Sequence, residues 1–381
     1  MAESRLGQRR RDNLLFKGGQ STLRRVMMVK SSTVNLFPEC IMAETQLSIL
    51  VLGGAGIQNS SVVRGISKNA SFSIKVLSRD IDSDECQSLS TIPNVTIVQG
   101  DCYNEDVLVS NFKGVDACFV NTNGFAVGEK AEVYWGIRMY EIAYWAGVKH
   151  FVYSALPYVS KKSGFNPKYR VPFADGKGKV AEYLQSQPTD RMIWSILESG
   201  PYADSHLVST WAPDQDADGT YVFRMPIGLD GAMAFVSLDD MGWYARYMFE
   251  HPVEFRGDLL SVGIEHADGE TVAKAFTAVT SKPARFEPVD LLKLAASWPD
   301  KKIGLAGSPG YEDPTLLDQA GHFVPWFTIW SESGGNKGLW SRNYERLDRI
   351  HPGRIRSVEQ WMRFVGFTGQ KSGEALKTGL S

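Results

Sequence analysis

The sequence predicts an α/β fold, in which a doubly wound parallel sheet is followed by a smaller α+β part at the C-terminus. Three observations predict it. Short apolar runs alternate with helical patterns from Leu47 to Tyr153. The first run ends in a glycine-rich turn at residues 53–56. After Lys162 the alternation loosens into segments rich in Gly, Pro and aromatic residues, which hold most of the tryptophans.

The expected strands are nearly continuous in apolar residues, which indicates that helices cover both faces of the sheet. The longest expected helix stops at Gly147, because glycine is favoured just past the end of a helix. In chain order, the expected strands are residues 47–52, 73–77, 95–101, 117–120, 150–153 and 192–197, and the expected helices are residues 60–68, 106–112, 130–146, 180–185, 240–250, 270–279 and 357–365.

The composition excludes several classes of protein. Lys plus Arg number 41 and Asp plus Glu number 43, a formal charge of −2, which argues against a protein whose main role is to bind nucleic acid. No apolar run approaches the roughly 18–20 residues that a membrane helix needs. The four cysteines lack C-x-x-C spacing, which excludes a disulfide scaffold and a structural zinc site and suits a reducing compartment.

A glycine-rich turn joins the first expected strand to the first helix. Residues 53–59 read Gly-Gly-Ala-Gly-Ile-Gln-Asn. Glycine lets backbone N–H groups approach a pyrophosphate, and the following helix N-terminus adds free N–H groups. We therefore expect a dinucleotide site, with a plain strand-to-helix turn as the alternative. Asn59 replaces the third glycine of the usual fingerprint, which argues against very close packing of helix and strand.

The end of the second expected strand indicates which dinucleotide binds. The chain there reads Leu77-Ser78-Arg79-Asp80. The Arg79 guanidinium can pair with a 2′-phosphate and Ser78 can add a hydroxyl, which favours NADP. An acidic residue near this place would bind the ribose 2′-OH of NAD, so Asp80 keeps NAD as an alternative. A solvated Arg79–Asp80 surface pair is the purely structural interpretation.

Three segments carry a resemblance to a known family. They are the glycine turn at residues 53–59 followed by Arg79, the segment Phe-Ala-Asp-Gly-Lys-Gly-Lys-Val at residues 173–180, and Ser-Val-Glu-Gln-Trp at residues 357–361. Together they resemble the NmrA-like family, atypical relatives of the short-chain dehydrogenases/reductases that include isoflavone reductase-like and phenylcoumaran benzylic ether reductase-like enzymes. The resemblance spans about residues 47–367.

The resemblance implies NADP(H) as the cofactor, with Arg79 on its 2′-phosphate. It implies that Asn121 and Thr122 lie beside the cofactor, Lys177 near the nicotinamide ribose, and residues 201–204 against the nicotinamide. The cofactor-binding residues expected in this way are Gly53, Gly54, Gly56, Ile57, Gln58, Asn59, Arg79, Asn121, Thr122, Lys177, Pro201 and Tyr202.

Lys177 is the candidate catalytic residue. In enzymes of the isoflavone reductase type, a lysine at this place is the proposed general acid/base, and hydrogen bonding to ribose hydroxyls is the alternative role. The Tyr-x-x-x-Lys spacing of typical short-chain dehydrogenases occurs at Tyr158 and Lys162, but nearby Pro, Ser and Gly residues predict a loop there. Tyr153 and Ser154 face the expected cleft, where a structural role is favoured.

The first 41 residues differ from the rest. They carry eight basic and three acidic residues and are rich in Ser and Arg. A mitochondrial transit peptide has this composition, but the acidic residues favour an unstructured tail or a start codon upstream of Met42. We expect a disordered basic extension at residues 1–41, an NADP-binding Rossmann domain at 42–200 and a mainly C-terminal substrate-binding part at 201–381. The expected location is cytoplasmic, or mitochondrial if the extension is a transit peptide.

The remaining motifs narrow the chemistry. The six histidines do not cluster at ligand spacing, so we expect no metal. The absence of Gly-x-Ser-x-Gly argues against a serine hydrolase. The stretch 322–330, His-Phe-Val-Pro-Trp-Phe-Thr-Ile-Trp, either lines a pocket for a planar substrate or forms plain core. Trp211, Tyr202 and Trp243 are weaker candidates for the same wall.

These observations favour an NADP(H)-dependent oxidoreductase that acts on a relatively large apolar or aromatic metabolite, as in secondary metabolism. The alternative is a non-catalytic NADP(H)-binding redox sensor that acts through protein–protein contacts. The lack of a helical Tyr-x-x-x-Lys pair favours that alternative. A third hypothesis uses the cofactor for cyclisation or another step without net redox change. The expected partner is a small-molecule substrate, with no membrane or nucleic acid, and a protein partner if the chain is a sensor.

Overall fold

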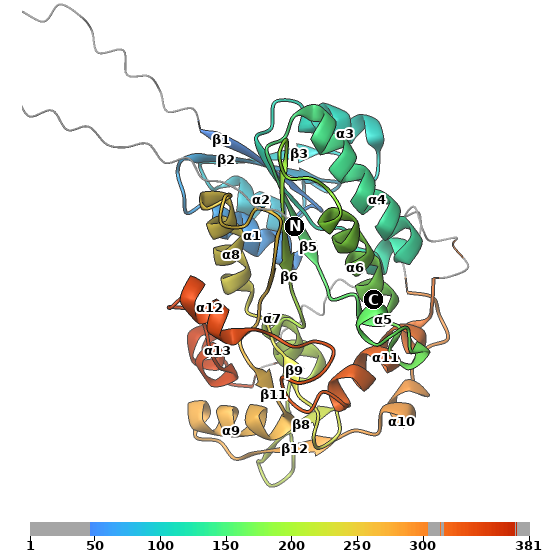
Figure 1. Cartoon of the computed structure of the whole chain (residues 1–381). Coiled ribbons are helices and arrows are strands. Elements are labelled where there is room, and N and C mark those ends of the chain that lie inside the picture. Colours follow the sequence, from blue (N-terminus) through green and yellow to red (C-terminus); the bar gives the residue numbers. More distant parts are fainter. Residues whose placement is uncertain (1–45, 304–312, 314–315, 370, 372–381) are drawn as a thin grey trace, which may run out of the picture. The chain divides into compact units, whose positions relative to one another are not determined.

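A computed structural model describes residues 46–303, 313, 316–369 and 371, which belong to one compact unit. The extension expected at residues 1–41 lies outside these residues. A seven-stranded parallel sheet runs through the unit in the order β10-β6-β5-β4-β1-β2-β3 (Figure 1). Its strands are β1 (Leu47–Leu52), β2 (Phe72–Ser78), β3 (Val95–Gln99), β4 (Ala117–Val120), β5 (His150–Ala155), β6 (Ile193–Glu198) and β10 (Asp258–Ser261).

Helices cover both faces of the sheet, as the continuous apolar strands predict. Successive residues of β1 point to opposite faces, so Ile49 and Val51 join one core cluster and Leu50 and Leu52 another. The first cluster is covered by α1 (Ile57–Ile66), α2 (Asp84–Ser90) and α8 (Leu238–Glu250), and the second by α3 (Glu105–Phe112), α4 (Gly124–Ala146) and α6 (Pro172–Gln185). The predicted doubly wound α/β fold is therefore confirmed.

The helices on one face cross at a glycine contact. A Cβ atom on Gly65 of α1 would lie 2.2 Å from the carbonyl oxygen of Gly242 in α8. A Cβ on Gly242 would in turn lie 2.3 Å from the carbonyl oxygen of Ser61. Only glycine permits this approach, which brings α8 onto α1 although they lie far apart in sequence.

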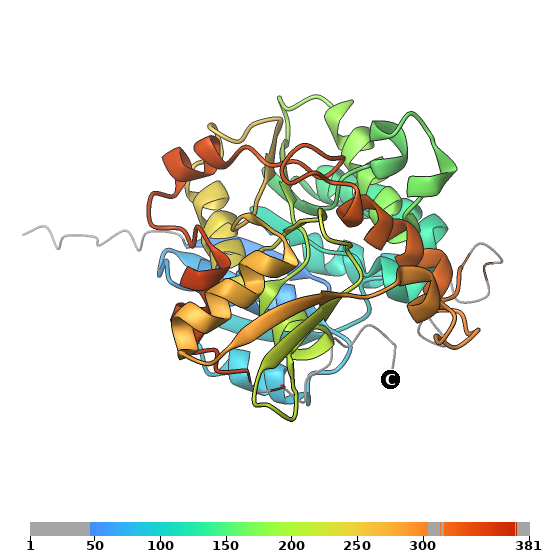
Figure 2. The ribbon, with the colours of Figure 1, turned by 90° about the horizontal axis from the view of Figure 1, so that it is seen from below.

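The C-terminal part adds to the described chain two small sheets, the short helix α7 (Ala203–Ser205) with the helical turn His206–Thr210 that follows it, and five further helices. One sheet has the order β12-β8-β7 and the other pairs β11 with β9. Figure 2 shows these elements from below, with α9 beside β12, a neighbour that it also has in Figure 1. The strands are β7 (Asp214–Gln215), β8 (Tyr221–Met225), β9 (Met233–Ala234), β11 (His266–Ala267) and β12 (Ala284–Pro288), and the helices are α9 (Gly269–Thr280), α10 (Leu291–Ala295), α11 (Gln319–Ser331), α12 (Tyr344–Ile350) and α13 (Val358–Val365).

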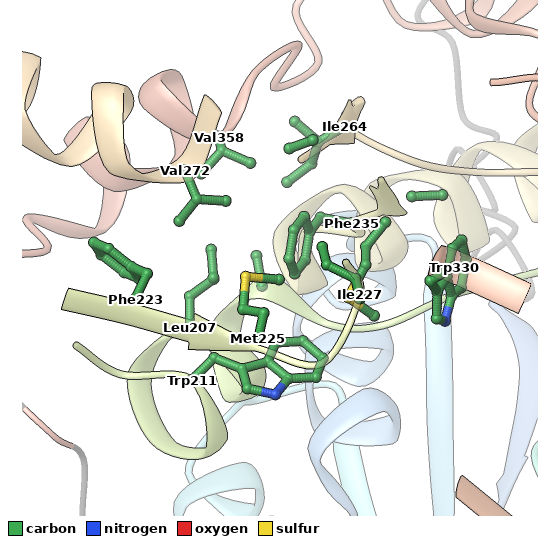
Figure 3. Close-up of a cluster of buried hydrophobic side chains, with 14 of the residues drawn as sticks. Leu207, Trp211, Phe223, Met225, Ile227, Phe235, Ile264, Val272, Trp330 and Val358 are labelled. Atoms are coloured by element: carbon green, nitrogen blue, oxygen red, sulfur yellow. The ribbon is translucent and has the colours of Figure 1, made fainter. Parts of the chain in front are cut away.

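A third hydrophobic core holds this part together. Phe223 and Met225 of β8, Val272 of α9, Trp330 of α11 and Val358 of α13 converge in it (Figure 3). Burying side chains of this size stabilises the fold by about 1.5–3 kcal/mol each. The described helices include none long and apolar enough to cross a membrane.

A buried arginine ties the C-terminal segment to the carboxyl end of β6. The Arg342 guanidinium pairs with Glu198 at 3.1 Å and donates to the backbone oxygens of Ser199 and Val262, both at 2.7 Å. A fully buried guanidinium needs such partners, because an unpaired charge there would be costly. The segment that follows β6 is thereby fixed above the edge of the sheet.

The structure corrects several of the elements that the sequence predicted. Helix α1 begins at Ile57 rather than residue 60, and β10 was not predicted. The expected helix 130–146 is the part of α4 after a break at Gly128, whose φ of +76° interrupts the helix. Residues 159–162 form a single helical turn, α5 (Val159–Lys162), where a loop was expected.

A further correction concerns α6, which begins at Pro172 instead of residue 180. Proline is favoured in a first helical turn, and the two glycines that weakened the helical pattern have a packing role. A Cβ on Gly178 would lie 2.4 Å from Cα of Tyr158, and one on Gly176 would lie 3.0 Å from Cγ of Glu132. Lys177 therefore lies inside a helix, not before one.

Candidate functional site

The candidate site lies at the sheet edge where the carboxyl ends of the strands meet. The order reverses at β1, because the chain continues from β1 to β2 on one side and from β4 to β5 on the other. In doubly wound sheets, ligands bind in the crevice at this switch point. The residues that follow β1, β4 and β6, namely Gly53, Asn121 and Tyr202, are brought together there.

The glycine turn after β1 has the backbone that the sequence predicts. The φ angles of Gly53 and Gly54 are +109° and +67°, values that favour glycine. A Cβ on Gly53 would lie 2.2 Å from the carbonyl oxygen of Asn121. No side chain of the described residues caps the N-terminus of α1, where Gly56 and Ile57 are exposed. The open turn and its free N–H groups fit a pyrophosphate.

Asn59 explains how the chain manages without the third glycine. Its buried Nδ2 donates to the backbone oxygen of Leu52 at 3.0 Å and of Gly54 at 3.2 Å. Its Oδ1 accepts from Nδ2 of Asn121 at 3.2 Å. The Asn59 amide thus bonds the first turn of α1 to the end of β1, at the position where the usual fingerprint has a glycine.

Gln58 joins three strand ends in one hydrogen-bond network. Its Nε2 donates to Oγ of Ser154, the second-last residue of β5, at 2.7 Å. Its Oε1 accepts from the Tyr202 hydroxyl at 2.7 Å and from Nδ2 of Asn121 at 3.1 Å. Burial raises the pKa of Tyr202 to about 12, so the hydroxyl stays a donor at neutral pH. Pro201, also expected at the site, is buried and accepts from the backbone N–H of Val236 at 2.9 Å.

Arg79 is exposed directly after β2. The described residues include no carboxylate within ion-pairing distance of its guanidinium, so the Arg79–Asp80 pair considered above does not form. Asp80 instead accepts from the backbone N–H of Asp82 at 3.2 Å, and Ser78 Oγ donates to the Asp80 carbonyl at 3.0 Å. Ser78 is buried in this turn. Arg79 is thus available to an anionic ligand.

Lys177 is enclosed at the end of β4. Its Nζ donates to the Thr122 carbonyl at 2.7 Å and to Oδ1 of Asn121 at 3.1 Å. It pairs with Oε1 of Glu132 at 3.0 Å and lies 5.6 Å from the ring centre of Tyr153. Lys177 is 9% exposed. The ammonium thus faces the site through Asn121 while its other partners lie within the core.

Glu132 is a site residue that sequence reasoning missed. It is 0% exposed, and its Oε1 also accepts from Oγ1 of Thr122 at 2.5 Å and from the Tyr153 hydroxyl at 3.4 Å. Burial, with Glu132 nearby, raises the pKa of Tyr153 well above its ordinary value. Glu132 and Lys177 lie far apart in the sequence and form no sequence motif. The pair is therefore visible only once α4 packs on α6.

Asp175 was also missed as a structural anchor. Its carboxylate accepts from the backbone N–H of Ser160 at 2.9 Å and of Val171 at 3.2 Å. It therefore holds α5 against the start of α6. Lys162 of α5 is exposed, whereas Tyr158 lies against the Phe165 ring, so the Tyr-x-x-x-Lys spacing does not form a catalytic pair.

The aromatic stretch 322–330 forms most of α11. Trp326, Phe327, Ile329 and Trp330 are buried in the third core, as the core interpretation predicts. Trp211 is buried beside them, whereas Trp243 stacks on His351 at 3.8 Å on another side of the fold. Within the described ranges, no group of His, Cys, Asp or Glu could hold a metal ion.

A doubly wound sheet with an open glycine turn at its switch point is a Rossmann-like, dinucleotide-binding type of fold. The model of the NmrA-like family matches residues 45–304. The chain therefore belongs to the NmrA-like family, and the resemblance inferred from the sequence is confirmed.

Relatives and solved structures extend this comparison. An NmrA-like family domain-containing oxidoreductase of Aspergillus flavus is 29% identical over 262 residues, covering 65% of this chain and 77% of the relative. The crystal structure of NmrA, a negative transcriptional regulator, in complex with NADP has a TM-score of 0.64 at 19% identity, covering 84% of this chain and 95% of that one. An NADPH-dependent quinone oxidoreductase from Escherichia coli has a TM-score of 0.60 at 17% identity, covering 84% and 100%. At these identities the two structures establish the fold.

Proposed function

We propose that this protein is an NADP(H)-dependent oxidoreductase that acts on a relatively large apolar or aromatic metabolite. The observation that carries the proposal is the exposed Arg79 guanidinium, which has no ion-pair partner among the described residues. It directly follows β2, whose Leu77 carbonyl accepts from the Gly54 N–H of the glycine turn. A guanidinium in this place suits a 2′-phosphate and therefore NADP rather than NAD. The relative from Aspergillus flavus, named an oxidoreductase, supports the assignment to an enzyme.

Some residues would contact the cofactor directly, and others support the turn that binds it. Gly53 and the first turn of α1 would bind the pyrophosphate through backbone N–H groups, whereas the Gly54 N–H donates to the Leu77 carbonyl at 3.0 Å and holds the turn against β2. Gln58 and Asn59 keep that turn in place through Asn121, Tyr202 and the end of β1. The bound cofactor supplies the hydride. We assign residues 42–200 to cofactor binding and residues 201–381 mainly to substrate binding, apart from Pro201 and Tyr202 at the cofactor site and from α8 and β10, which belong to the seven-stranded sheet and its cover.

The partners of Lys177 indicate that it binds the cofactor ribose and donates a proton. Its ammonium lies next to Asn121, on the side of the sheet edge where the nicotinamide ribose is expected, and Glu132 balances its charge from inside the fold. Asn121 and Lys177 can bind ribose hydroxyls, and Lys177 can give a proton to a reduced substrate from this position. Glu132 acts through Lys177, so it is a positioning residue.

A second function follows from the same contacts. Because Lys177 already has Thr122, Asn121 and Glu132 as partners, it can serve structure and cofactor binding without turnover. A redox sensor that binds NADP(H) and acts through protein contacts needs this cofactor site but no catalytic residue. NmrA, which is described as a negative transcriptional regulator, has the same fold.

A turnover assay separates the two functions. The full chain with NADPH is screened against aromatic ketones and quinones by following the nicotinamide absorbance, beside Lys177→Ala. The enzyme hypothesis predicts substrate-dependent oxidation of NADPH that Lys177→Ala reduces by about 10²–10⁴-fold, the usual contribution of a general acid. Tight NADPH binding with no oxidation across the panel would contradict the enzyme and support the sensor.

A further inference from the structure

Two histidines outside the cofactor residues have buried ring nitrogens without a hydrogen-bond partner among the described residues. They are His206, through Nδ1, and His322, through both nitrogens. His322 is only 1% exposed. Buried polar groups in proteins almost always have a partner, so a water molecule or a bound ligand is expected to supply one here. Neither histidine contributes to the network around Gln58 and Lys177.

Aromatic rings surround both histidines. The His206 ring stacks on Trp211 with centroids 4.5 Å apart, and it lies 5.9 Å from Trp326. The His322 ring lies 6.1 Å from Phe173. His322 and Trp326 are one turn apart on α11 and so share a face of that helix. Trp326 thus contacts His206 and lies on the same face of α11 as His322.

Two helical turns connect this ring cluster to the expected position of the nicotinamide. Phe173 precedes Lys177 by one turn of α6, so both lie on the same face of the helix. The backbone N–H of His206 donates to the Tyr202 carbonyl at 2.9 Å, which places His206 one turn beyond the residue that bonds Gln58. His206 is therefore one helical turn from Tyr202, and His322 contacts a ring that is one helical turn from Lys177.

Partly exposed rings lie beside His322. Phe125, in the first turn of α4, is 6.4 Å from His322. The ring of Phe125 stacks on that of Phe323, with centroids 5.9 Å apart and an interplanar angle of 21°. Trp298 lies 6.3 Å from Phe323. All three side chains are partly exposed, and flat apolar rings of this kind favour an aromatic partner.

We propose that His206 and His322 bind the substrate, a flat, uncharged aromatic compound that carries oxygen or nitrogen atoms able to hydrogen-bond. This inference rests on the proposed function and names the substrate class of the same site. The ring faces of Phe125 and Phe323 select a planar molecule. The ring nitrogens orient it by accepting or donating hydrogen bonds.

The charges near the histidines explain why the substrate is uncharged. Burial lowers the pKa of His206 to about 3 and that of His322 to about 4, so both are neutral at pH 7. Of the charged groups that act on His322, Arg170 pairs with Glu129, and Asp318 caps α11 by accepting from the backbone N–H of Gly321. No free positive charge is thus directed at the site by these groups, and a carboxylate-bearing ligand would lose its hydration without gaining a partner.

The test is a calorimetric titration of the full chain with 2-naphthol and with 2-naphthoate, which differ in a hydroxyl and a carboxylate. We expect 2-naphthol to bind at least about tenfold more tightly. His206→Phe and His322→Phe are each expected to weaken 2-naphthol binding by about tenfold, the usual effect of one hydrogen bond. His322→Gln keeps polar groups and should retain most of the affinity. Exposed His251, in His251→Phe, is the matched control and should change nothing.

Thermal unfolding of the same variants separates binding from structure. Because both His322 nitrogens lack partners, His322→Phe should unfold at the same temperature as the wild type or higher. Unchanged 2-naphthol affinity in both Phe variants, or 2-naphthoate binding as tightly, would overturn the inference. NADPH binding without 2-naphthol binding refutes only this inference, and 2-naphthol binding without NADPH binding refutes only the cofactor proposal.

Discussion

The Glu132–Lys177 pair gives a prediction whose size follows from the structure. The two charged atoms are 3.0 Å apart, and the side chains are 0% and 11% exposed. Removing one member of a buried pair leaves the other charge uncompensated, which costs about 3–5 kcal/mol. Lys177 keeps the Thr122 carbonyl and Asn121 as acceptors, so we take the lower end. Glu132→Gln, which keeps the size of the side chain, should lower the free energy of unfolding by about 3 kcal/mol.

The assay is urea unfolding at pH 7 of Glu132→Gln, Lys177→Met and the double variant. Because the double variant leaves no buried charge, it should cost about as much as one single variant rather than twice as much. The exposed pair Lys161–Glu182 is the matched control, with an expected coupling energy below about 1 kcal/mol. A cost of Glu132→Gln below about 1 kcal/mol, or full additivity in the double variant, would refute the reasoning.

Two further predictions concern the glycine turn and a buried carboxyl. Gly53→Ala should lower the free energy of unfolding by about 1–3 kcal/mol more than Gly56→Ala in urea unfolding. The φ of Gly53 is +109° and its Cβ would lie 2.2 Å from the Asn121 carbonyl oxygen, whereas a Cβ on Gly56 would meet the Gly53 carbonyl oxygen at an ordinary 4.0 Å. Equal costs would contradict the turn geometry. Burial raises the pKa of Asp240 from 3.8 to about 7, so its carboxyl favours folding when protonated, and stability from this group is lost as pH rises from about 4 to about 7. Asp240→Asn should therefore become more stable relative to wild type across this range, and a difference that is flat with pH would be the contrary result.

Much of the sheet could be predicted from the sequence because its strands are short, apolar and separated by helices. β10 escaped prediction because the Asp-Leu-Leu-Ser of residues 258–261 is too short to show a pattern, and its pairing with β6 depends on chain distant in sequence. The start of α6 was missed because Gly176 and Gly178 lower helix propensity, whereas in the fold they allow close packing.

The site was predictable only where function imposes a local pattern. The glycine turn and Arg79 follow strands in the expected order, so the sequence places them correctly at one edge of the sheet. Glu132 and His322 have no such pattern, since each meets its neighbours through helix packing. Asn59 shows a different limit, because its residue type alone does not reveal that its amide bonds to the Leu52 carbonyl and to Asn121.

The central claim is that the open glycine turn and Arg79 bind NADP(H). The most direct measurement is a calorimetric titration of the full chain with NADPH and NADH, repeated on Arg79→Ala and on Lys149→Ala, an exposed lysine before β5 at the opposite edge of the sheet. NADPH should bind at least about tenfold more tightly than NADH, since a charge-assisted pair contributes about 1.5–3 kcal/mol. Arg79→Ala should erase that preference and Lys149→Ala should keep it. Equal affinities for NADPH and NADH in the wild type, or a preference that survives Arg79→Ala, would contradict the account.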